Sequence, residues 1–483
     1  MPDKFYITTT LPYVNADPHL GFALEIVQAD AIARYHKLLG EEVFFNTGTD
    51  EHGVKIQRKA EEQGRETQGY VDEYAAKFKN LMPALGISQD IHFIRTTEPR
   101  HKAAVQAFWK KCLDNGDIYK QAYKVKYCVG CELEKTDSEL VDGKCPIHPN
   151  LEIELIEEEN YFFKFSKYQQ PLLKFYEANP EFVVPDFRFN EIKQFVKTGL
   201  QDFSISRLKE KMPWGIPVPD DDSQVMYVWF DALINYISTL GWPENEQQFG
   251  QFWPGMQIAG KDNLRQQSAM WQAMLMSAGL PNSKQIIIHG FITSGGQKMS
   301  KSLGNVADPY EILSKLKEKG LSEEQAIDAL RYYLLREVPT FEDGDYTWER
   351  FQETYNAGLA NGIGNQASRI LKLAVSNQVL PPQGFGGQDS RIEVMGKYRL
   401  KEAMDEIWKS ISECDEYIQR TEPFKKIKTD PDAAKKDILH TVLHLKAVAE
   451  RLRAFLPYTS EKLLAVLRDP KLENIPRLFP RIE

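Results

Sequence analysis

Residues 5–45, FYITTTLPYVNADPHLGFALEIVQADAIARYHKLLGEEVFF, decide the fold of this chain. The run 5–10 is rich in aromatic and β-branched residues, and Pro12 ends it, which predicts a strand. From Gly21 to about Leu39 apolar residues recur at helical spacing, and Gly40 is a typical C-terminal stop. Residues 43–45 read as a second short strand. Strand, helix and strand in this order predict the βαβ unit of a parallel sheet.

The same alternation returns far downstream. Strands are expected at 225–230, 257–260 and 286–289, whereas the stretch between, rich in Tyr, Phe, Lys and Glu, breaks the rhythm. Beyond about residue 345 the strand signals vanish and amphipathic helical sequence remains. We therefore expect an α/β fold with a Rossmann-type doubly wound parallel sheet, a metal-bearing insertion and a C-terminal α-helical bundle. The expected boundaries are 1–116 and 226–345 for the two halves of the sheet domain, 117–225 for the insertion and 346–483 for the bundle.

The composition is that of a globular protein with several domains. The chain has 483 residues, of which 42% are hydrophobic and 27% charged. A net charge of −9 argues against a general DNA-coating protein, although local basic patches can still contact nucleic acid. No apolar run is long enough to span a bilayer, and the first residues lack a signal-peptide pattern. We expect a cytoplasmic protein.

Two distant stretches carry residues suited to a polyphosphate. His19 can donate a hydrogen bond to a phosphate oxygen, and Gly21 lets a nucleotide approach the backbone. Lys298 and Lys301, in the stretch KMSKS, can neutralise charge on a departing pyrophosphate. Taken alone, His19 fits a helix cap and the lysine stretch fits a solvated surface. Because a doubly wound sheet brings both to one edge, their combination predicts ATP activation of a small acid.

Five cysteines in a chain of this length are not a disulfide framework. Cys128 and Cys131 are followed by Cys145 and His148, two short pairs separated by a loop. This spacing predicts a tetrahedral zinc site, and four protein ligands make it structural, with one zinc ion per chain. The alternative, four unrelated residues, is rare at this spacing. Cys112 and Cys414 stand alone and are expected to be buried.

His19-Leu20-Gly21 and residues 298–302 resemble the HIGH and KMSKS motifs of the class I aminoacyl-tRNA synthetases. Enzymes of that family join an amino acid to ATP as an aminoacyl-adenylate and then pass it to the terminal ribose of tRNA. The stretches 11–15, 48–53 and 227–236 are similar to the methionyl branch of the family. The resemblance implies a methionine–tRNA ligase that uses L-methionine, ATP with Mg²⁺, and tRNA(Met).

The resemblance also implies site residues. The catalytic set would be His19, Lys298 and Lys301, and the ATP-binding set would add Gly21, Glu25, Gly260 and Asp262. The methionine-binding set would be Leu11, Tyr13, Asp50, Trp229, Tyr236 and Gln267, with Asp50 on the ammonium group. Aromatic rings suit a thioether and a buried carboxylate suits a cation. Core packing is the simpler reading of Trp229 and Tyr236, and helix capping that of Asp262.

Two positions depart from the family pattern. Phe22 stands where the first motif has a second histidine, and a phenyl ring cannot donate to a phosphate. Gln266 and Gln267 stand where the family carries an aromatic or proline followed by a histidine. We hypothesise that Phe22 and Gln267 face one cavity and changed together.

The family uses its C-terminal helical bundle to read the tRNA anticodon. Asn361, Asn365 and Arg369 are spaced i, i+4 and i+8, which predicts one helix face, although such a stripe also fits solvated surface. Phe424 follows a proline at a position where the family stacks an aromatic ring on a base. No oligonucleotide-binding appendix follows the bundle, so a monomer is expected.

Two other interpretations stay open. One is a class I synthetase for cysteine, leucine, isoleucine or valine, although the insertion is short for an editing domain and its metal ligands do not suggest a catalytic zinc. The other is a synthetase-like RNA-binding protein without activity, which the departures at Phe22 and Gln267 keep possible. Pyrophosphate exchange dependent on an amino acid separates them.

Overall fold

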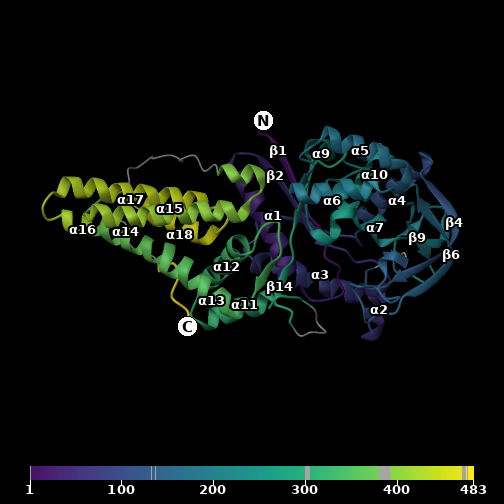
Figure 1. The fold of residues 1–483 in the computed structure, drawn as a ribbon, viewed down its shortest axis with the longest axis horizontal. Coiled ribbons are helices and arrows are strands. Elements are labelled where there is room, and N and C mark those ends of the chain that lie inside the picture. Colours follow the sequence, from purple (N-terminus) through teal and green to yellow (C-terminus); the bar gives the residue numbers. More distant parts are fainter. Residues whose placement is uncertain are drawn as a thin grey trace.

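A computed structural model describes residues 2–131, 133–135, 137–299, 305–379, 392–469, 475 and 477–483. A six-stranded sheet lies at its centre (Figure 1) in the order β3-β2-β1-β12-β13-β7, and every neighbouring pair is parallel. The order reverses between β1 and β12, where doubly wound sheets open a ligand crevice at the carboxyl ends of the strands. The strands are β1 (Lys4–Thr9), β2 (Glu42–Thr49), β3 (His92–Arg95), β7 (Val183–Val184), β12 (Met256–Gly260) and β13 (Gln285–His289).

Strand pleating explains why this sheet is buried on both sides. Phe5 and Ile7 of β1 belong to a core cluster with α1 and α3, whereas Tyr6 belongs to a second cluster with α4 and α10. The predicted first helix is confirmed: α1 begins and ends within one residue of expectation, and Gly40 beyond it has φ of +87°. Helices of this domain are α1 (Leu20–Leu38), α2 (Val54–Glu62), α3 (Thr67–Ala84), α4 (Pro99–Asp114), α7 (Val228–Ala232), α8 (Asn235–Ser238), α9 (Glu246–Phe252) and α10 (Trp271–Ser277).

The strand expected at 225–230 is wrong. β11 (Asp221–Met226) ends there, pairs antiparallel with β9 in a small separate sheet, and is followed by α7. The Tyr227 amide donates to the Ile205 carbonyl, and the chain then turns into the helix. A short apolar run fits a buried helix as well as a buried strand, so its pattern could not decide.

The insertion projects from one end of the sheet domain (Figure 1). Its main feature is the long antiparallel pair β4 (Ile118–Cys128) and β6 (Glu154–Phe163), flanked by β5 (Leu133–Lys135) and β8 (Phe203–Ser204). Within the same stretch, β7 joins the central sheet beside β13. The other elements are α5 (Gln169–Ala178), α6 (Asp186–Lys197), β9 (Ser206–Leu208) and β10 (Pro217–Val218).

A small sheet and two helices connect the sheet domain to the bundle at the opposite end (Figure 1). They are β14 (Ile292–Ser294), β15 (Gln297–Lys298), β16 (Gly344–Tyr346), α11 (Pro309–Glu318) and α12 (Glu323–Tyr332). The bundle holds α13 (Trp348–Thr354), α14 (Asn365–Ser376), α15 (Leu400–Thr421), α16 (Pro423–Lys426), α17 (Pro431–Leu452) and α18 (Pro457–Arg468). Among the described residues, no helix is long and apolar enough to cross a membrane.

Candidate active site and metal centre

His19 and Gly21 lie at the N-terminus of α1, on the β1 side of the crevice. The His19 ring folds back so that its Nδ1 accepts from the Gly21 amide at 3.0 Å. A neutral ring in this geometry carries its proton on Nε2, which is then able to donate to a phosphate oxygen. A Cβ on residue 21 would lie 2.8 Å from His19 Cε1, so only glycine permits this arrangement.

The KMSKS stretch follows a tight hairpin beside the same helix end. β14 and β15 pair Thr293 with Lys298 through a turn in which Gly295 and Gly296 both have positive φ, the geometry of a type I′ turn. Ser300, Lys301 and Ser302 lie outside the described residues. Further along the chain, the Ala307 carbonyl accepts a hydrogen bond from the Leu20 amide at 2.9 Å. The chain on the far side of the stretch is thus tied to the start of α1.

The residues expected to contact adenosine lie on both sides of the crevice. Gly260 ends β12, and the exposed Asp262 follows in a short 3₁₀ helix. A Cβ on Gly260 would approach Asp262 Oδ1 to 2.9 Å, so glycine leaves room for that carboxylate. Glu25 is buried on α1, and its Oε1 accepts from the Thr10 amide and hydroxyl at 2.8 and 2.6 Å. These side chains therefore come from both sides of the switch point.

Asp50 and the loop after β1 meet at the carboxyl end of β2. The Asp50 amide donates to the Pro12 carbonyl at 2.9 Å, and the Val14 amide donates to the Asp50 carbonyl at 3.2 Å. Asp50 is 7% exposed, which places its carboxylate in a largely dry position. Leu11 and Tyr13 on the facing loop are half-buried.

Aromatic residues of the insertion and α7 pack beside Tyr13. Tyr127, Tyr227 and Val228 form a small core cluster, against which the half-buried Tyr13 and Trp229 pack. Trp229 Nε1 is buried without a hydrogen-bond partner among the described residues. The structure thus brings together Tyr13 and Trp229, which are far apart in the sequence.

Tyr236, Gln267 and Gln257 form a buried chain of side-chain hydrogen bonds. Gln267 Nε2 donates to the Tyr236 hydroxyl at 2.7 Å, and Gln257 Nε2 donates to Gln267 Oε1 at 3.1 Å. Burial raises the pKa of Tyr236 well above its usual value, and the charges of Glu25 and Asp50 reach it and add to the shift. Tyr236 therefore lies within electrostatic range of both predicted substrate-binding carboxylates.

The hypothesis that Phe22 and Gln267 share a cavity is wrong. Phe22 packs edge-on against Phe78, with ring centroids 5.2 Å apart, in the cluster that includes Met256 and Ile258. Gln257, which binds Gln267, lies between Met256 and Ile258 on β12. Because successive side chains alternate across a strand, Gln267 and Phe22 contact opposite faces of the sheet.

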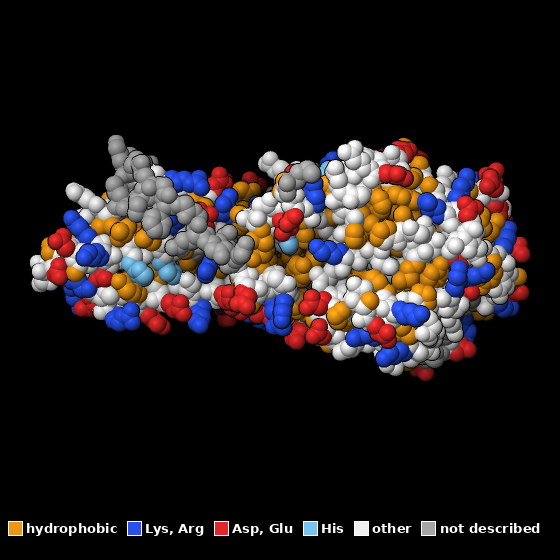
Figure 2. Space-filling model, turned by 90° about the horizontal axis from the view of Figure 1, so that it is seen from above, with side chains coloured by type: hydrophobic (Ala, Val, Ile, Leu, Met, Phe, Trp, Pro, Cys, Tyr) orange, Lys and Arg blue, Asp and Glu red, His pale blue; other side chains and the backbone are white. Residues whose placement is uncertain are grey.

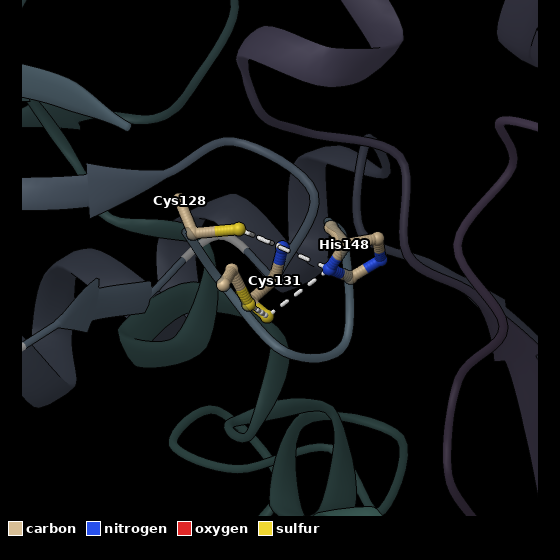
Figure 3. Close-up of side chains that lie close together, drawn as sticks. Cys128, Cys131 and His148 are labelled. Atoms are coloured by element: carbon tan, nitrogen blue, oxygen red, sulfur yellow. Dashed lines mark hydrogen bonds between the residues drawn. The ribbon is translucent and has the colours of Figure 1, made fainter. Parts of the chain in front are cut away.

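The predicted metal ligands converge on one point of the insertion. Figure 3 shows Cys128 and Cys131 directed toward His148. His148 Nδ1 lies 3.8 Å from Cys128 Sγ and 3.2 Å from Cys131 Sγ, and the Cys131 and Cys145 sulfurs are 3.5 Å apart. Gly130 is required at the turn, since a Cβ there would come within 2.5 Å of the His148 ring. Cys112 and Cys414 are buried, as expected.

The donor set has the size of a tetrahedral metal site. All four ligand atoms lie within 4.8 Å of one another. Zinc with usual bond lengths to sulfur and imidazole would separate the sulfurs by about 3.8 Å and sulfur from nitrogen by about 3.6 Å. The prediction that these four residues come together is confirmed, and the cluster they form could hold a metal ion.

Comparison with known proteins agrees with the resemblance to the class I aminoacyl-tRNA synthetases. A family model described as tRNA synthetases class I (M) matches residues 5–153 and 149–371. This chain belongs to the class I methionyl-tRNA synthetase family. It is 40% identical to the methionine–tRNA ligase of Mesorhizobium japonicum over 97% of this chain and 92% of that one. It is 43% identical to the methionine–tRNA ligase of Thermotoga maritima over 87% of this chain and 68% of that one.

A solved structure gives the same result in three dimensions. The Mycobacterium tuberculosis methionyl-tRNA synthetase in complex with methionyl-adenylate is similar with a TM-score of 0.88 and 34% identity. The likeness covers 96% of this chain and 94% of that chain. The doubly wound sheet expected from the sequence is thereby confirmed as the fold of a methionyl-tRNA synthetase.

Two buried polar groups near the synthetase site escaped sequence reasoning. Arg207 lies over the Tyr227 and Tyr127 rings, at 4.3 and 5.3 Å from their centroids. Asp231 accepts from or shares protons with His52 at 2.6 Å and His101 at 2.8 Å. Burial alone raises the pKa of Asp231, but both histidines lower it to about 2. Asp231 and His52 lie in stretches that resemble the family, but their pairing joins separate elements, and Arg207 lies in no such stretch.

In the bundle of this synthetase, the expectation of one regular helix face is wrong. Asn361 lies in a π-helical segment, Tyr355–Gly364, and Gly362 has non-helical backbone angles before Asn365 begins α14. Glycines permit this widening, and a Cβ at Gly358 would come within 1.9 Å of the Tyr332 hydroxyl.

The side chains expected at the anticodon nonetheless reach the surface. Asn361 and Asn365 are exposed, and Phe424 of α16 is 44% exposed, one of the most exposed large apolar side chains described. Arg369 is half-buried, and its Nη1 lies 3.4 Å from Asp415 Oδ1. On the face seen in Figure 2, positive and negative side chains are intermixed.

Proposed function

We propose that this chain is a methionine–tRNA ligase. It activates L-methionine with ATP to methionyl-adenylate, releases pyrophosphate, and transfers methionine to the 3′-terminal ribose of tRNA(Met). The observation that carries the proposal is that His19 lies at the start of α1 beside the β14–β15 hairpin, while Asp50 lies next to Tyr13 and the aromatic cluster at the carboxyl end of β2. A Mycobacterium tuberculosis protein of the same fold was solved in complex with methionyl-adenylate, which supports this reading.

In the activation step the chain supplies positioned charge. His19 donates from Nε2 to a phosphate of ATP, whose negative charge bound Mg²⁺ partly neutralises. Gly21 keeps the helix N-terminus open to the nucleotide, and Glu25, Gly260 and Asp262 hold the adenosine. Lys298 and Lys301 stabilise the pyrophosphate as it leaves, because charge develops there in the transition state.

Methionine is recognised by charge at one end and by aromatic rings at the other. The buried Asp50 carboxylate pairs with the substrate ammonium group. Leu11, Tyr13, Trp229 and Tyr236 enclose the thioether, and Gln267 fixes the Tyr236 hydroxyl at 2.7 Å. The substrate carboxylate is left pointing at the α-phosphate for attack.

The cysteine–histidine cluster holds one structural zinc ion in this proposal. Cys128, Cys131, Cys145 and His148 complete a tetrahedral set, so no position is left for a reacting water. Bound zinc would supply folding energy to the tip of the insertion. Val129 packs against the cluster of Tyr127, Tyr227 and Val228 on which Tyr13 and Trp229 also pack, so an ordered knuckle would support these aromatic residues. A metal assay of purified protein tests this, and the absence of zinc would refute it.

Transfer to tRNA uses the bundle as a second recognition site. Asn361 and Asn365 would read base edges, Phe424 would stack on a base, and Arg369 would bind phosphate or stack. In this proposal the chain has a catalytic sheet domain in two halves, 1–116 and 226–345, an insertion, 117–225, and a tRNA-binding bundle, 346–483. The proposed active form is a monomer, and its proposed place is the cytoplasm, where tRNA serves translation.

The deciding experiment is pyrophosphate exchange with each amino acid in turn. Exchange that requires methionine supports the proposal, and exchange with cysteine, leucine, isoleucine or valine would correct it. The variant His19→Ala should lose exchange, while His36→Ala, at the other end of α1, serves as the matched control. No exchange with any amino acid would favour an RNA-binding protein without catalytic activity.

A further inference from the structure

A buried histidine closes the nucleotide side of the crevice. His289 is the last residue of β13 and lies in register with Gly260, the last residue of β12. Its side chain is almost fully buried, with 4% of the residue exposed. Nδ1 lies 2.7 Å from the Gly290 carbonyl oxygen, and Nε2 lies 2.9 Å from Glu25 Oε2. Both ring nitrogens therefore face an oxygen acceptor.

These partners determine the charge on the ring. A backbone carbonyl can only accept, so Nδ1 donates to Gly290. Glu25 accepts two hydrogen bonds from Thr10 at its other oxygen, as an ionised carboxylate does. An imidazole is a stronger base than a carboxylate, so the proton between Nε2 and Glu25 belongs to the histidine. The geometry describes an imidazolium–carboxylate pair inside the protein.

The surrounding charges are consistent with this state. Burial alone lowers the pKa of His289, but the hydrogen bond and charge of Glu25, the Gly290 carbonyl and the charge of Asp262 raise it above its usual value. Tyr236 also lies within electrostatic range of Glu25, and burial keeps it neutral. Asp262, which follows β12, is therefore a further negative group that faces the pair.

We propose that His289 is a positioning residue for ATP. Its imidazolium bridges the Gly290 carbonyl and the Glu25 carboxylate, and so fixes that carboxylate for the nucleotide ribose. A carboxylate has about four lone-pair sites, and the contacts from Thr10 and His289 use three. The fourth is left for one ribose hydroxyl, in a direction set by the other three. The inference rests on the proposed function only in taking Glu25 as a nucleotide contact.

The consequence is specific to ATP. Without His289 the Glu25 side chain gains rotational freedom and its charge loses a buried partner. Methionine binds on the other side of β12, where the chain of Gln257, Gln267 and Tyr236 lies. Loss of His289 should therefore raise the KM for ATP and leave the KM for methionine near its original value. A merely structural role would change both constants together, or neither.

The test compares His289→Ala, His289→Gln and the control His36→Ala by pyrophosphate exchange and by direct calorimetric titration with ATP. His36 also pairs with a carboxylate, its Nδ1 lying 2.8 Å from Glu41 Oε2, but at the C-terminal end of α1. His289→Ala should raise the KM for ATP about tenfold, the effect of losing one charge-assisted hydrogen bond. His289→Gln keeps one donor toward Glu25 and should show a smaller rise, and His36→Ala should show none.

A pH profile adds a second readout. In the wild type, the KM for ATP should rise as pH increases through the pKa of His289, whereas His289→Gln should be flat over that range. Equal changes in both KM values, or a flat wild-type profile with unchanged ATP affinity in His289→Ala, would overturn the inference. If the wild type shows no exchange but His289→Ala still weakens ATP binding, the proposed function fails and the positioning role stands. If His289→Ala does not fold, His289→Gln carries the comparison.

Discussion

Replacing Gly21 with alanine should remove the phosphate contact of His19 without unfolding the protein. The new Cβ would lie 2.8 Å from His19 Cε1 and 3.0 Å from Nδ1, so the ring must leave its position at the start of α1. Losing the cap costs about 1 kcal/mol, and alanine in a helix regains about 0.5–1 kcal/mol, so thermal stability should barely change. Losing one preorganised donor to transition-state charge costs about 2.7–4 kcal/mol. Pyrophosphate exchange should therefore fall by about 10²–10³ in kcat.

A double-mutant cycle tests whether the alanine acts through the ring. If Gly21→Ala works only by displacing His19, the double variant with His19→Ala should lose no more activity than His19→Ala alone. Gly250→Ala is the matched control, because it also lies in a helix, α9, and a Cβ there has no neighbour within 4 Å. Additive losses, or normal exchange in Gly21→Ala, would refute the reasoning.

Three further predictions concern the bundle and its junction with the sheet domain. Phe424→Ala should raise the KM for tRNA about fivefold or more, since a stacked base contributes about 1–3 kcal/mol, and should leave pyrophosphate exchange unchanged. Arg331→Met should lower the free energy of unfolding by about 1.5–3 kcal/mol in urea titrations, because it removes the Arg331 partner of the buried Asp30 at 2.8 Å, while Arg34 and Ser88 still bind that carboxylate. Burial raises the pKa of Asp328 to about 6, above its unfolded value, so the stability linked to this group is present below about pH 4 and lost as pH rises through 6. Asp328→Asn should therefore raise the melting temperature relative to wild type more at pH 8 than at pH 5, and an equal difference at both would contradict this.

The parts of the fold that the sequence predicted are those with a local cause. Alternating apolar segments gave β1, α1 and β2, because each element is long enough for its periodicity to be distinctive. The metal cluster was equally predictable, since two short pairs of ligands need only one turn to meet. The crevice at the switch point then followed from the topology of parallel sheets.

The structural elements that the sequence did not predict depend on contacts between distant segments. Val228–Ala232 is helical although its apolar run fits a strand, and the two-residue β7 is too short to carry any pattern. The π-helical widening near Gly362 requires packing against another helix, which spacing alone does not reveal. His289 could have been found, because it ends a predicted strand on the edge where ligands bind. Arg207 gave no signal, since a single arginine is usually exposed.

The two substrates meet polar groups of different chemistry on the two sides of the switch point. Tyr236 on the methionine side is held by the amides of Gln257 and Gln267, none of which titrates near neutral pH, and burial keeps the phenol neutral. On the nucleotide side, Glu25 is held by His289, which is titratable; burial lowers its pKa, but the hydrogen bond and charge of Glu25 outweigh burial and raise it above its usual value. The glutamine at position 267 therefore fixes the methionine pocket by hydrogen bonds whose strength does not depend on pH. As pH rises through the raised pKa of His289, the KM for ATP should change and the KM for methionine should not. Introducing a histidine by Gln267→His should make the KM for methionine depend on pH. A KM for methionine that did not change with pH in this variant would show that the ring at position 267 does not contact the substrate pocket.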